Sequence, residues 1–349
     1  MNNTSNSLVS GIDPASFSAV TGPSQDLFRF VNGPWVDMYR LPDDRSRYGS
    51  FDKLAEDAEN QIRDILEEDD CPAVKSRALY HSFLDVDAID AAGLAAIEDQ
   101  LASIDEAEDK AALTRALGAM NPTGGPDLIG IAVYGDPGAP ETNVVHIEQD
   151  GLDLPDEAYY REDHYAPIRE AYVEMVAKQL KNAHLAADDE DAHAQAKRFL
   201  DVETRIAANH WDNVSTRDSV KTYNPTDYAD LCAMLADVDL DAWIDAWQNA
   251  YDATTAAAVQ PLDFRGCFSH TIVHEPSFLT GLNAFWKEAS LDDLKLWARV
   301  HVVIGSTLEL PHEFDETNFD FYGKTLSGQK EQRVRSVSYT HLTLPTILR

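Results

Sequence analysis

The stretch SLDDLKLWARVHVVIGSTLE, residues 290–309, shows most clearly which kind of fold this chain adopts. Its apolar side chains recur at intervals of three and four residues, which places them on one face of an α-helix. That face consists of Leu291, Leu294, Trp297, His301, Ile304 and Leu308. Ser290 and Asp293 resemble a capping box, so we expect the helix to begin at Ser290. We interpret His301 as a packed core residue rather than a metal ligand.

Similar periodicity covers most of the chain. From Ser50, a suitable N-cap, apolar residues follow helical spacing as far as Leu66. A second helix follows Pro72, whose ring suits a first helical turn. Its apolar stripe is Val74, Ala78, Leu79 and Phe83. Further helical patterns occupy 88–104, 107–119, 165–182, 191–212, 225–236 and 240–251.

One segment departs from this helical pattern. Leu128–Tyr134 and Asn143–Glu148 are runs rich in β-branched residues on either side of a Gly/Pro/Asp turn. Such a pattern predicts a β-hairpin at about residues 128–148. The predicted fold class is therefore mainly α, a multi-helix domain with one small β-hairpin. Residues 1–24 are rich in Ser, Asn and Gly, and we expect them to form a disordered tail.

Composition and charge narrow the class of protein. The chain has 349 residues, of which 44% are hydrophobic, so it can bury a sizeable core. No uncharged apolar run is long enough to cross a membrane. The net charge of −33 argues against nucleic acid as a partner, because phosphate binding needs clustered Lys and Arg. The acidic run DDED, 188–191, is interpreted as a solvated loop; weak attraction of cationic peptides is the alternative reading.

The N-terminal sequence and the cysteines indicate in which cellular compartment we expect the protein. The first residues lack a basic region followed by an apolar stretch, so we find no secretion signal. Cys71, Cys232 and Cys267 are odd in number and far apart, which favours buried, reduced thiols. We therefore expect a cytoplasmic protein.

Two His-Glu pairs, in HEPSF (274–278) and HEFDE (312–316), match the first half of the zinc-peptidase signature H-E-x-x-H. That signature works because two histidines four residues apart share one helical face and bind the same ion. Neither pair has a second histidine at that spacing. His270 and His274 are four apart, but Thr271, Ile272 and Val273 between them favour a strand. No zinc site, nucleotide loop or hydrolase elbow is predicted.

The segment DLFRFVNGPWVDMYRLPDDRSRYGSFDKLAED, residues 26–57, closely resembles the N-terminal region of neprilysin-like zinc metallopeptidases. This family includes the endothelin-converting enzymes and the bacterial oligopeptidases called PepO. Three more blocks occur in the family's order: VVHIEQDGLDLPDEAYY (144–160), RDSVKTYNP (217–225) and FDFYGKTLSG (319–328). Together they cover most of residues 25–332.

The resemblance implies a mainly helical protein whose two lobes enclose a cavity for short peptides. In the family the zinc-binding H-E-x-x-H lies in the C-terminal half, which this chain does not contain. The chain therefore resembles the lid lobe alone, inactive by itself and without bound zinc, although the full-length enzyme would hold zinc. We expect residues 25–50 to pack on the missing catalytic lobe and residues 51–332 to form the helical lobe. The alternative is a freestanding helical protein that binds peptides without cleaving them.

The resemblance also implies one substrate-binding residue. In the family's RYG-F block the arginine helps to hold the carboxy-terminal carboxylate or the backbone of the peptide, and here it is Arg47. A guanidinium can donate two parallel hydrogen bonds to a carboxylate; a structural ion pair is the other interpretation. Some members carry a second arginine where this chain has Ala55, and extracellular members have a disulfide cysteine where it has Asn32. The latter difference fits a reduced, bacterial type.

The last stretch, RVRSVSYTHLTLPTILR (333–349), differs in composition from the rest. It contains no Asp or Glu, whereas all 61 acidic residues precede it. It resembles translated adapter or vector sequence, so we predict that it is a non-native tail.

Overall fold

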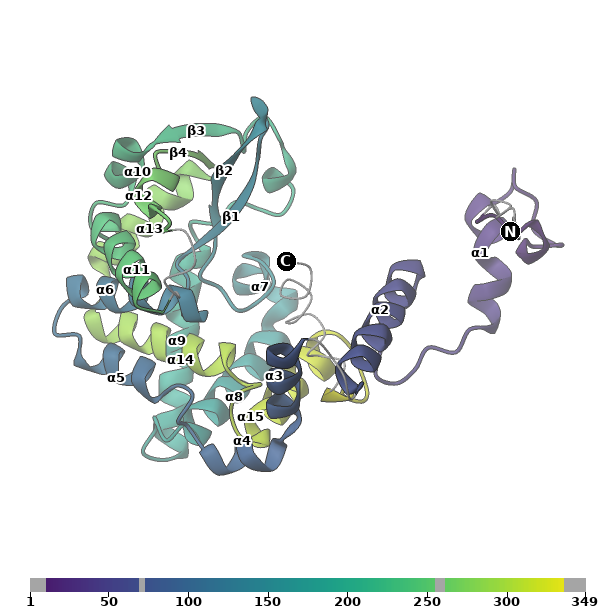
Figure 1. Ribbon diagram of the computed structural model, residues 1–349, viewed down its shortest axis with the longest axis horizontal. Helices are drawn as coiled ribbons and strands as arrows, with labels where there is room; N and C mark the ends of the chain where they lie inside the picture. Colours follow the sequence, from purple (N-terminus) through teal and green to yellow (C-terminus); the bar gives the residue numbers. More distant parts are fainter. Residues whose placement is uncertain (1–10, 69–72, 255–260, 336–349) are drawn as a thin grey trace.

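The computed structural model describes residues 11–68, 73–254 and 261–335. The predicted fold class is confirmed, because these residues form a mainly α-helical structure with one small sheet. Most of the chain forms a rounded body, from which α1 and α2 project as an arm (Figure 1). The α-helices are α1 (Leu27–Met38), α2 (Ser50–Glu67), α3 (Val74–Leu84), α4 (Val86–Ala92), α5 (Glu98–Glu106), α6 (Lys110–Met120), α7 (Ala158–Arg161), α8 (Ala166–Asn182), α9 (Asp189–Ala207), α10 (Tyr228–Met234), α11 (Leu240–Thr254), α12 (Phe264–Cys267), α13 (Pro276–Glu288), α14 (Leu291–Gly305) and α15 (His312–Asn318).

The predicted β-hairpin is confirmed and belongs to a larger sheet. Strands β1 (Ile129–Asp136) and β2 (Ala139–Gln149) pair antiparallel. Strand β4 (His270–Val273) joins β2 in parallel, and β3 (Asn224–Asp227) pairs antiparallel with β4, giving the order β1-β2-β4-β3. The prediction of a helix over 225–236 was therefore wrong at its start, where strand pairing with β4 prevails over helical spacing.

Several predicted helices differ in detail from the structure, and the predicted helix over 191–212 is α9, which ends at Ala207. The N-cap of α2 is Gly49, not Ser50, and no side chain caps this end. The pattern over 88–104 is divided between α4 and α5, because Gly93 adopts φ +59°, a left-handed conformation that ends a helix. In α3, Val74 and Leu79 are exposed, whereas Tyr80 is buried.

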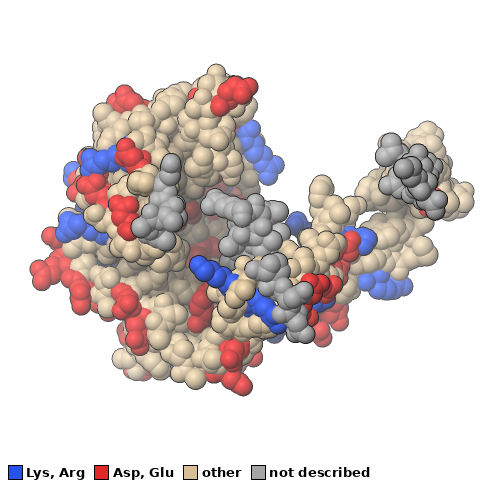
Figure 2. All heavy atoms as spheres, viewed as in Figure 1, with Lys and Arg blue, Asp and Glu red and all other residues tan. Residues whose placement is uncertain are grey.

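Carboxylates are spread over the surface of the body rather than gathered in one patch. Figure 2 shows Asp and Glu over most of its visible face, with Lys and Arg in fewer groups. The run 188–191 is solvated as predicted, but it is not a loop. Asp188 is the N-cap of α9 and accepts the N–H of Asp191, and the next acids lie in the first turn. Negative charge is favourable there, because the helix dipole is positive at its N-terminus.

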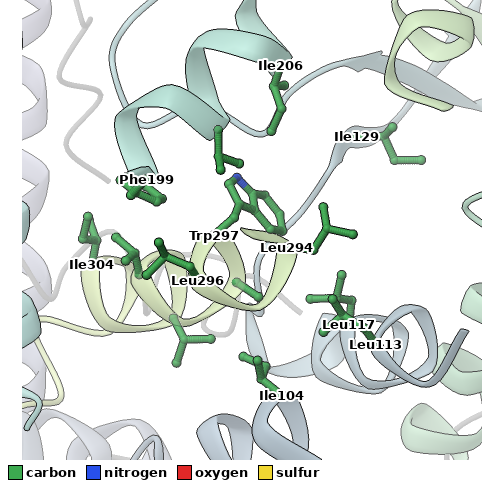
Figure 3. Packing of buried hydrophobic residues seen from close by; sticks show 14 of the residues in the cluster. Ile104, Leu113, Leu117, Ile129, Phe199, Ile206, Leu294, Leu296, Trp297 and Ile304 are labelled. Atoms are coloured by element: carbon green, nitrogen blue, oxygen red, sulfur yellow. The ribbon is translucent and has the colours of Figure 1, made fainter. Parts of the chain in front are cut away.

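The main core is organised around α14, whose start is as predicted: the Ser290 side chain accepts the N–H of Asp293. Leu294 and Trp297 are fully buried and meet side chains from α6 and α9 (Figure 3). The Trp297 indole N–H donates to the carbonyl of Gly151, 3.2 Å away, which ties α14 to the segment after β2. Burying a side chain of this size contributes about 1.5–3 kcal/mol or more to stability.

A second, small core joins the arm to the body. Ile62 and Leu66 of α2 pack against Tyr80 and Phe83 of α3. The N-terminal half of α2 lies outside this contact, and its Phe51 is exposed. The arm is therefore held to the body through the end of α2 and also through its linker, where Asp43 pairs with Lys330 at 2.6 Å.

Arg333 and Arg335 belong to the stretch that we predicted to be non-native. Arg333 pairs with the buried Glu59 of α2 at 2.8 Å, and the Arg335 guanidinium lies 4.2 Å from the ring centroid of Phe83. Residues 336–349 lie outside the described residues, as do 1–10 of the predicted disordered tail. Within 11–24, Phe17 contacts Phe30 of α1, with ring centroids 5.0 Å apart.

Candidate functional site

The RYG-F block, residues 47–51, covers the end of the linker between α1 and α2 and the first two residues of α2. Three aromatic rings order this linker. Tyr39 stacks between Trp35 and Tyr48, with ring centroids 4.7 Å and 4.8 Å away. The interplanar angles are 23° and 22°, so the rings are nearly parallel. Such offset stacks add to the stabilisation from apolar burial. The linker is thereby held close to α1 at its beginning and to α2 at its end.

Tyr48 is also attached to α2 through its hydroxyl group. The hydroxyl donates to Glu56 at 2.9 Å. This hydrogen bond, together with burial and the Glu56 charge, raises the pKa of Tyr48 to about 12. Arg45 lies 3.9 Å from the same carboxylate, with its guanidinium 5.6 Å from the centroid of the Tyr48 ring. Arg45 is thus a structural residue.

Arg47 is in a different environment from Arg45. It is exposed, and within the described ranges 11–68, 73–254 and 261–335 it makes no ion pair. Its neighbour Tyr48 lines a cavity of about 440 Å³ between α1 and the start of α2. Phe28, Trp35 and Val36 supply an apolar wall.

The opposite side of this cavity is polar, and its Lys53 pairs with Asp57 at 3.0 Å. Ser50 and Lys53 of α2 line it, and the free N–H groups of the first turn of α2 have no side-chain cap. A helix N-terminus favours anions. The arrangement can therefore accommodate a carboxylate beside an apolar side chain.

The two His-Glu pairs occupy unrelated places. In the first, His274 follows β4 and Glu275 precedes α13; the Glu275 carboxylate accepts the N–H of Gln149 at 3.0 Å, and burial raises its pKa to about 7. In the second, His312 begins α15 and its Nδ1 lies 2.8 Å from Asp90. Both pairs are thus engaged in contacts that join elements.

The prediction that His270 and His274 flank a strand is confirmed by β4. In a strand, residues four apart are separated by about 13 Å, too far to share one ion. His270 lies 3.5 Å from Asp136, whereas His274 Nε2 lies 2.9 Å from His146 Nδ1.

One group in the described part of the chain offers three potential metal ligands within 4.8 Å of one another: Asp153, Glu203 and His301. As predicted, His301 packs in the core, against Trp297 and Phe199. Its two nitrogens face different carboxylates, Nδ1 towards Asp153 and Nε2 towards Glu203. A catalytic zinc needs its ligands directed at one point and an open coordination position. The group of Asp153, Glu203 and His301 therefore does not have the geometry of a catalytic zinc site.

Sequence reasoning missed Asp153 and Glu203. Glu203 lies on the buried face of α9, where a single carboxylate among apolar residues is the signal that could have revealed it. Asp153 lies in the block GLDLP, within a stretch that the family resemblance already marked.

The comparisons with known proteins agree with this fold. The model of the N-terminal part of peptidase family M13 matches residues 23–348, which include most of the stretch that we predicted to be non-native. The chain belongs to peptidase family M13. It corresponds to the N-terminal part of its neprilysin-like members, a family of zinc metallopeptidases.

Human neprilysin is 24% identical over 332 residues, covering 88% of this chain and 44% of neprilysin. The crystal structure of Mycobacterium tuberculosis zinc metalloprotease Zmp1 in complex with inhibitor is 30% identical, with a TM-score of 0.82. The aligned region covers 97% of this chain and 50% of the Zmp1 chain. PepO from Lactobacillus rhamnosis HN001 shares the fold, with a TM-score of 0.71 at 17% identity, over 93% of this chain and 50% of PepO. The chain thus spans half or less of these relatives.

The described residues contain no helix that is both long enough and apolar enough to cross a membrane.

Proposed function

We propose that this chain is the substrate-capturing lobe of a zinc metallo-oligopeptidase that cleaves short peptides. In this proposal the catalytic zinc is held by a separate lobe of the full-length protein. The match to family M13 and the extent of that match, about half of each solved relative, support the proposal. The described side chains here would supply peptide binding and orientation, whereas the zinc would supply the activated water that attacks the peptide bond.

The observation that carries the proposal is the apolar surface of the arm. Phe28, Met38, Phe51 and Leu54 are 64%, 75%, 85% and 63% exposed. Trp35, in the same helix as Phe28, is 44% exposed. Exposed apolar groups of this density mark an interaction surface. We propose that residues 25–50 pack on the catalytic lobe, while residues 51–332 form the lid.

Arg47 is the proposed substrate-binding residue. It is exposed and unpaired among the described residues, next to a cavity with an apolar wall and an uncapped helix N-terminus. A peptide carboxylate could accept hydrogen bonds from its guanidinium while an apolar side chain enters the cavity. Because position 55 is alanine, a strict requirement for a free carboxy-terminus is not part of the proposal.

The test begins with the source reading frame beyond residue 332, which should encode H-E-x-x-H in the half that follows. The longer protein should hydrolyse a short fluorogenic peptide and should lose this activity to a zinc chelator. The 349-residue chain alone should be inactive and should bind no stoichiometric zinc. A longer protein that is folded, contains zinc and still leaves every short peptide intact would refute the proposal.

The alternative function is a freestanding helical peptide-binding protein. The cavity beside Arg47 supports this alternative only if α1 and α2 are stable without a second lobe packed on them. A stop codon directly after this chain, together with micromolar peptide binding by the isolated monomer, would establish the alternative in place of the peptidase.

A further inference from the structure

Three segments that are far apart in the sequence meet at one buried histidine. His301 lies in the middle of α14, Glu203 lies on α9, and Asp153 belongs to the segment between β2 and α7. Nδ1 of His301 is 3.5 Å from Asp153 Oδ1, and Nε2 is 3.3 Å from Glu203 Oε1. The imidazole can carry a proton on each nitrogen only in its charged form. The two-sided geometry therefore suits an imidazolium between two carboxylates.

The other partners of Glu203 are hydrogen-bond donors. Glu203 is fully buried, and its Oε2 accepts the hydroxyl groups of Tyr160 at 3.0 Å and Tyr172 at 2.8 Å. Its Oε1 accepts the backbone N–H of Asp153 at 2.9 Å. A positive charge beside a buried carboxylate stabilises the fold, because an uncompensated buried charge is costly.

His301 is the basic group that faces this carboxylate. The acidic groups around it are Asp153 and Glu203 in contact, with Asp150 and Asp127 near enough to interact electrostatically. The other titratable groups facing the cluster are the hydroxyls of Tyr160, Tyr172 and Tyr322. Among the described residues, no Lys or Arg forms an ion pair with Asp150, Asp153 or Glu203.

We propose that protonated His301 is a clasp that holds the segment 149–157 onto α9 and α14, and that loss of its proton loosens this segment. The segment is a wall of a polar cavity of about 250 Å³, whose other side includes His210 and Trp211. Neutral His301 would leave two carboxylates facing each other across an uncharged ring. The clasp therefore makes the order of this cavity wall depend on pH. The proposal is independent of the peptidase function.

The direction of the pH effect follows from the environment of His301. Burial by itself lowers its pKa, but the charge of Asp153 and the contact and charge of Glu203 outweigh burial, so the pKa of His301 is raised. A folded-state pKa above the unfolded value of about 6.5 means that the folded protein holds this proton more tightly. The stability contributed by the His301 proton is thus present below about pH 6.5 and is lost as the pH rises through the folded pKa. Burial raises the pKa of Asp153 to about 6, so its contact with His301 joins two charged groups only above that pH.

The decisive experiment compares thermal unfolding of the 349-residue chain with His301→Gln and with His301→Gln/Asp153→Asn at pH 7 and pH 8.5. At pH 7, where the Asp153 carboxyl is above its pKa of about 6, His301→Gln should lower the unfolding midpoint by roughly 5–15 °C. Adding Asp153→Asn should recover at least half of that loss, because it removes one of the unbalanced charges. The midpoint of the unmodified chain should fall towards that of His301→Gln at pH 8.5. The matched control is His312→Gln, which removes an exposed histidine from its pair with Asp90 and should have little effect.

A second measurement covers the case in which His301→Gln does not fold. NMR titration of the unmodified chain should show His301 charged at pH 7, and amide exchange corrected for intrinsic rates should accelerate in 149–157 relative to α8 when it titrates. Titration of His301 below pH 6.5, or no recovery on adding Asp153→Asn, would overturn the clasp. Stoichiometric zinc lost on His301→Gln would likewise overturn it and would identify a metal site instead.

Discussion

Arg45 and Arg47 lie in the same linker between α1 and α2, but they differ in their contacts. Arg45 approaches Glu56 and lies over the ring of Tyr48, so its charge and stem are used within the fold. Arg47, two residues later, is exposed and unpaired among the described residues, beside a cavity. A guanidinium that is already paired within the fold is not free to bind a ligand, whereas an unpaired guanidinium is free to do so.

This contrast predicts the effect of Arg47→Ala in the full-length enzyme. We expect the KM for short peptides to rise more than kcat falls, because the lost contact binds substrate and transition state alike. The loss of a charge-assisted hydrogen bond corresponds to roughly ten- to hundred-fold in kcat/KM. Arg115→Ala provides a matched control, since Arg115 is an exposed arginine on α6, away from the cavity. Equal kinetics for both folded variants and the unmodified enzyme would show that Arg47 binds no substrate.

Two helical glycines differ in the space that surrounds the position of a Cβ atom. Gly118 of α6 lies against the backbone of Trp243 in α11, and a Cβ at this position would overlap the Trp243 carbonyl. Gly305, at the end of α14, has open space around the position of a Cβ. The two glycines are therefore a matched pair: both are helical, but one is buried in a close helix contact and the other is exposed.

We expect Gly118→Ala to lower the free energy of unfolding by about 1–3 kcal/mol, because α6 and α11 must separate to admit the methyl group. Gly305→Ala should leave that free energy unchanged or raise it by about 0.4–1 kcal/mol, since alanine restricts the unfolded chain. Urea unfolding monitored by far-ultraviolet circular dichroism measures both. A destabilisation of the same size in both variants would contradict the helix contact.

The arm predicts an uneven distribution of local stability. In the described residues, α1 buries only Gly33, whereas α14 buries eight residues. Few buried contacts mean that opening costs little free energy. Hydrogen exchange in the isolated chain should be fastest over residues 25–45 among its structured parts, and the chain should self-associate through the exposed apolar face. A stable monomer with 25–45 protected as well as α14 would speak against a missing lobe at this surface.

At the scale of the whole molecule, electrostatic repulsion is the dominant feature. The chain has 61 acidic residues and 28 Lys and Arg, and its formal net charge is −33. Figure 2 shows acids dispersed over the visible face of the body, where they outnumber Lys and Arg. Self-repulsion of this kind destabilises a compact state and is reduced by salt, because the Debye length falls from about 10 Å at 0.1 M to about 3 Å at 1 M.

Raising KCl from 0.1 to 2 M should therefore raise the unfolding midpoint by roughly 10 °C, with most of the gain below about 1 M. Sucrose at the same osmolality serves as the control, since it carries no charge. Neutralising several exposed acids, such as Glu106, Glu108 and Glu288, should reduce the dependence on salt. An unfolding midpoint that is independent of KCl would show that dispersed repulsion does not limit stability.

The sequence by itself determined the features that depend on short spacing. The helical repeat in 290–309 identified α14, its cap and the buried Leu294, Trp297 and Ile304, although α14 buries other residues as well. The β-branched runs identified the hairpin, and the ordered motifs identified the family. Each run or motif is a short stretch of consecutive residues. Secondary structure and family membership could therefore be predicted without coordinates.

Only the tertiary structure decided which residues meet. The distances between Asp153, Glu203 and His301 arise from the packing of α9, α14 and the segment after β2, and no local pattern encodes them. In the same way, residues 225–227 became a strand because β4 offers them hydrogen-bond partners, against the helical spacing of their own sequence. The exposure of the arm is also a tertiary fact: Phe17 and Tyr48 contact side chains of α1, but its Leu27, Phe28 and Met38 stay exposed. Long-range contacts select among locally acceptable conformations, and for that reason the clasp around His301 and the free guanidinium of Arg47 could be recognised only in three dimensions.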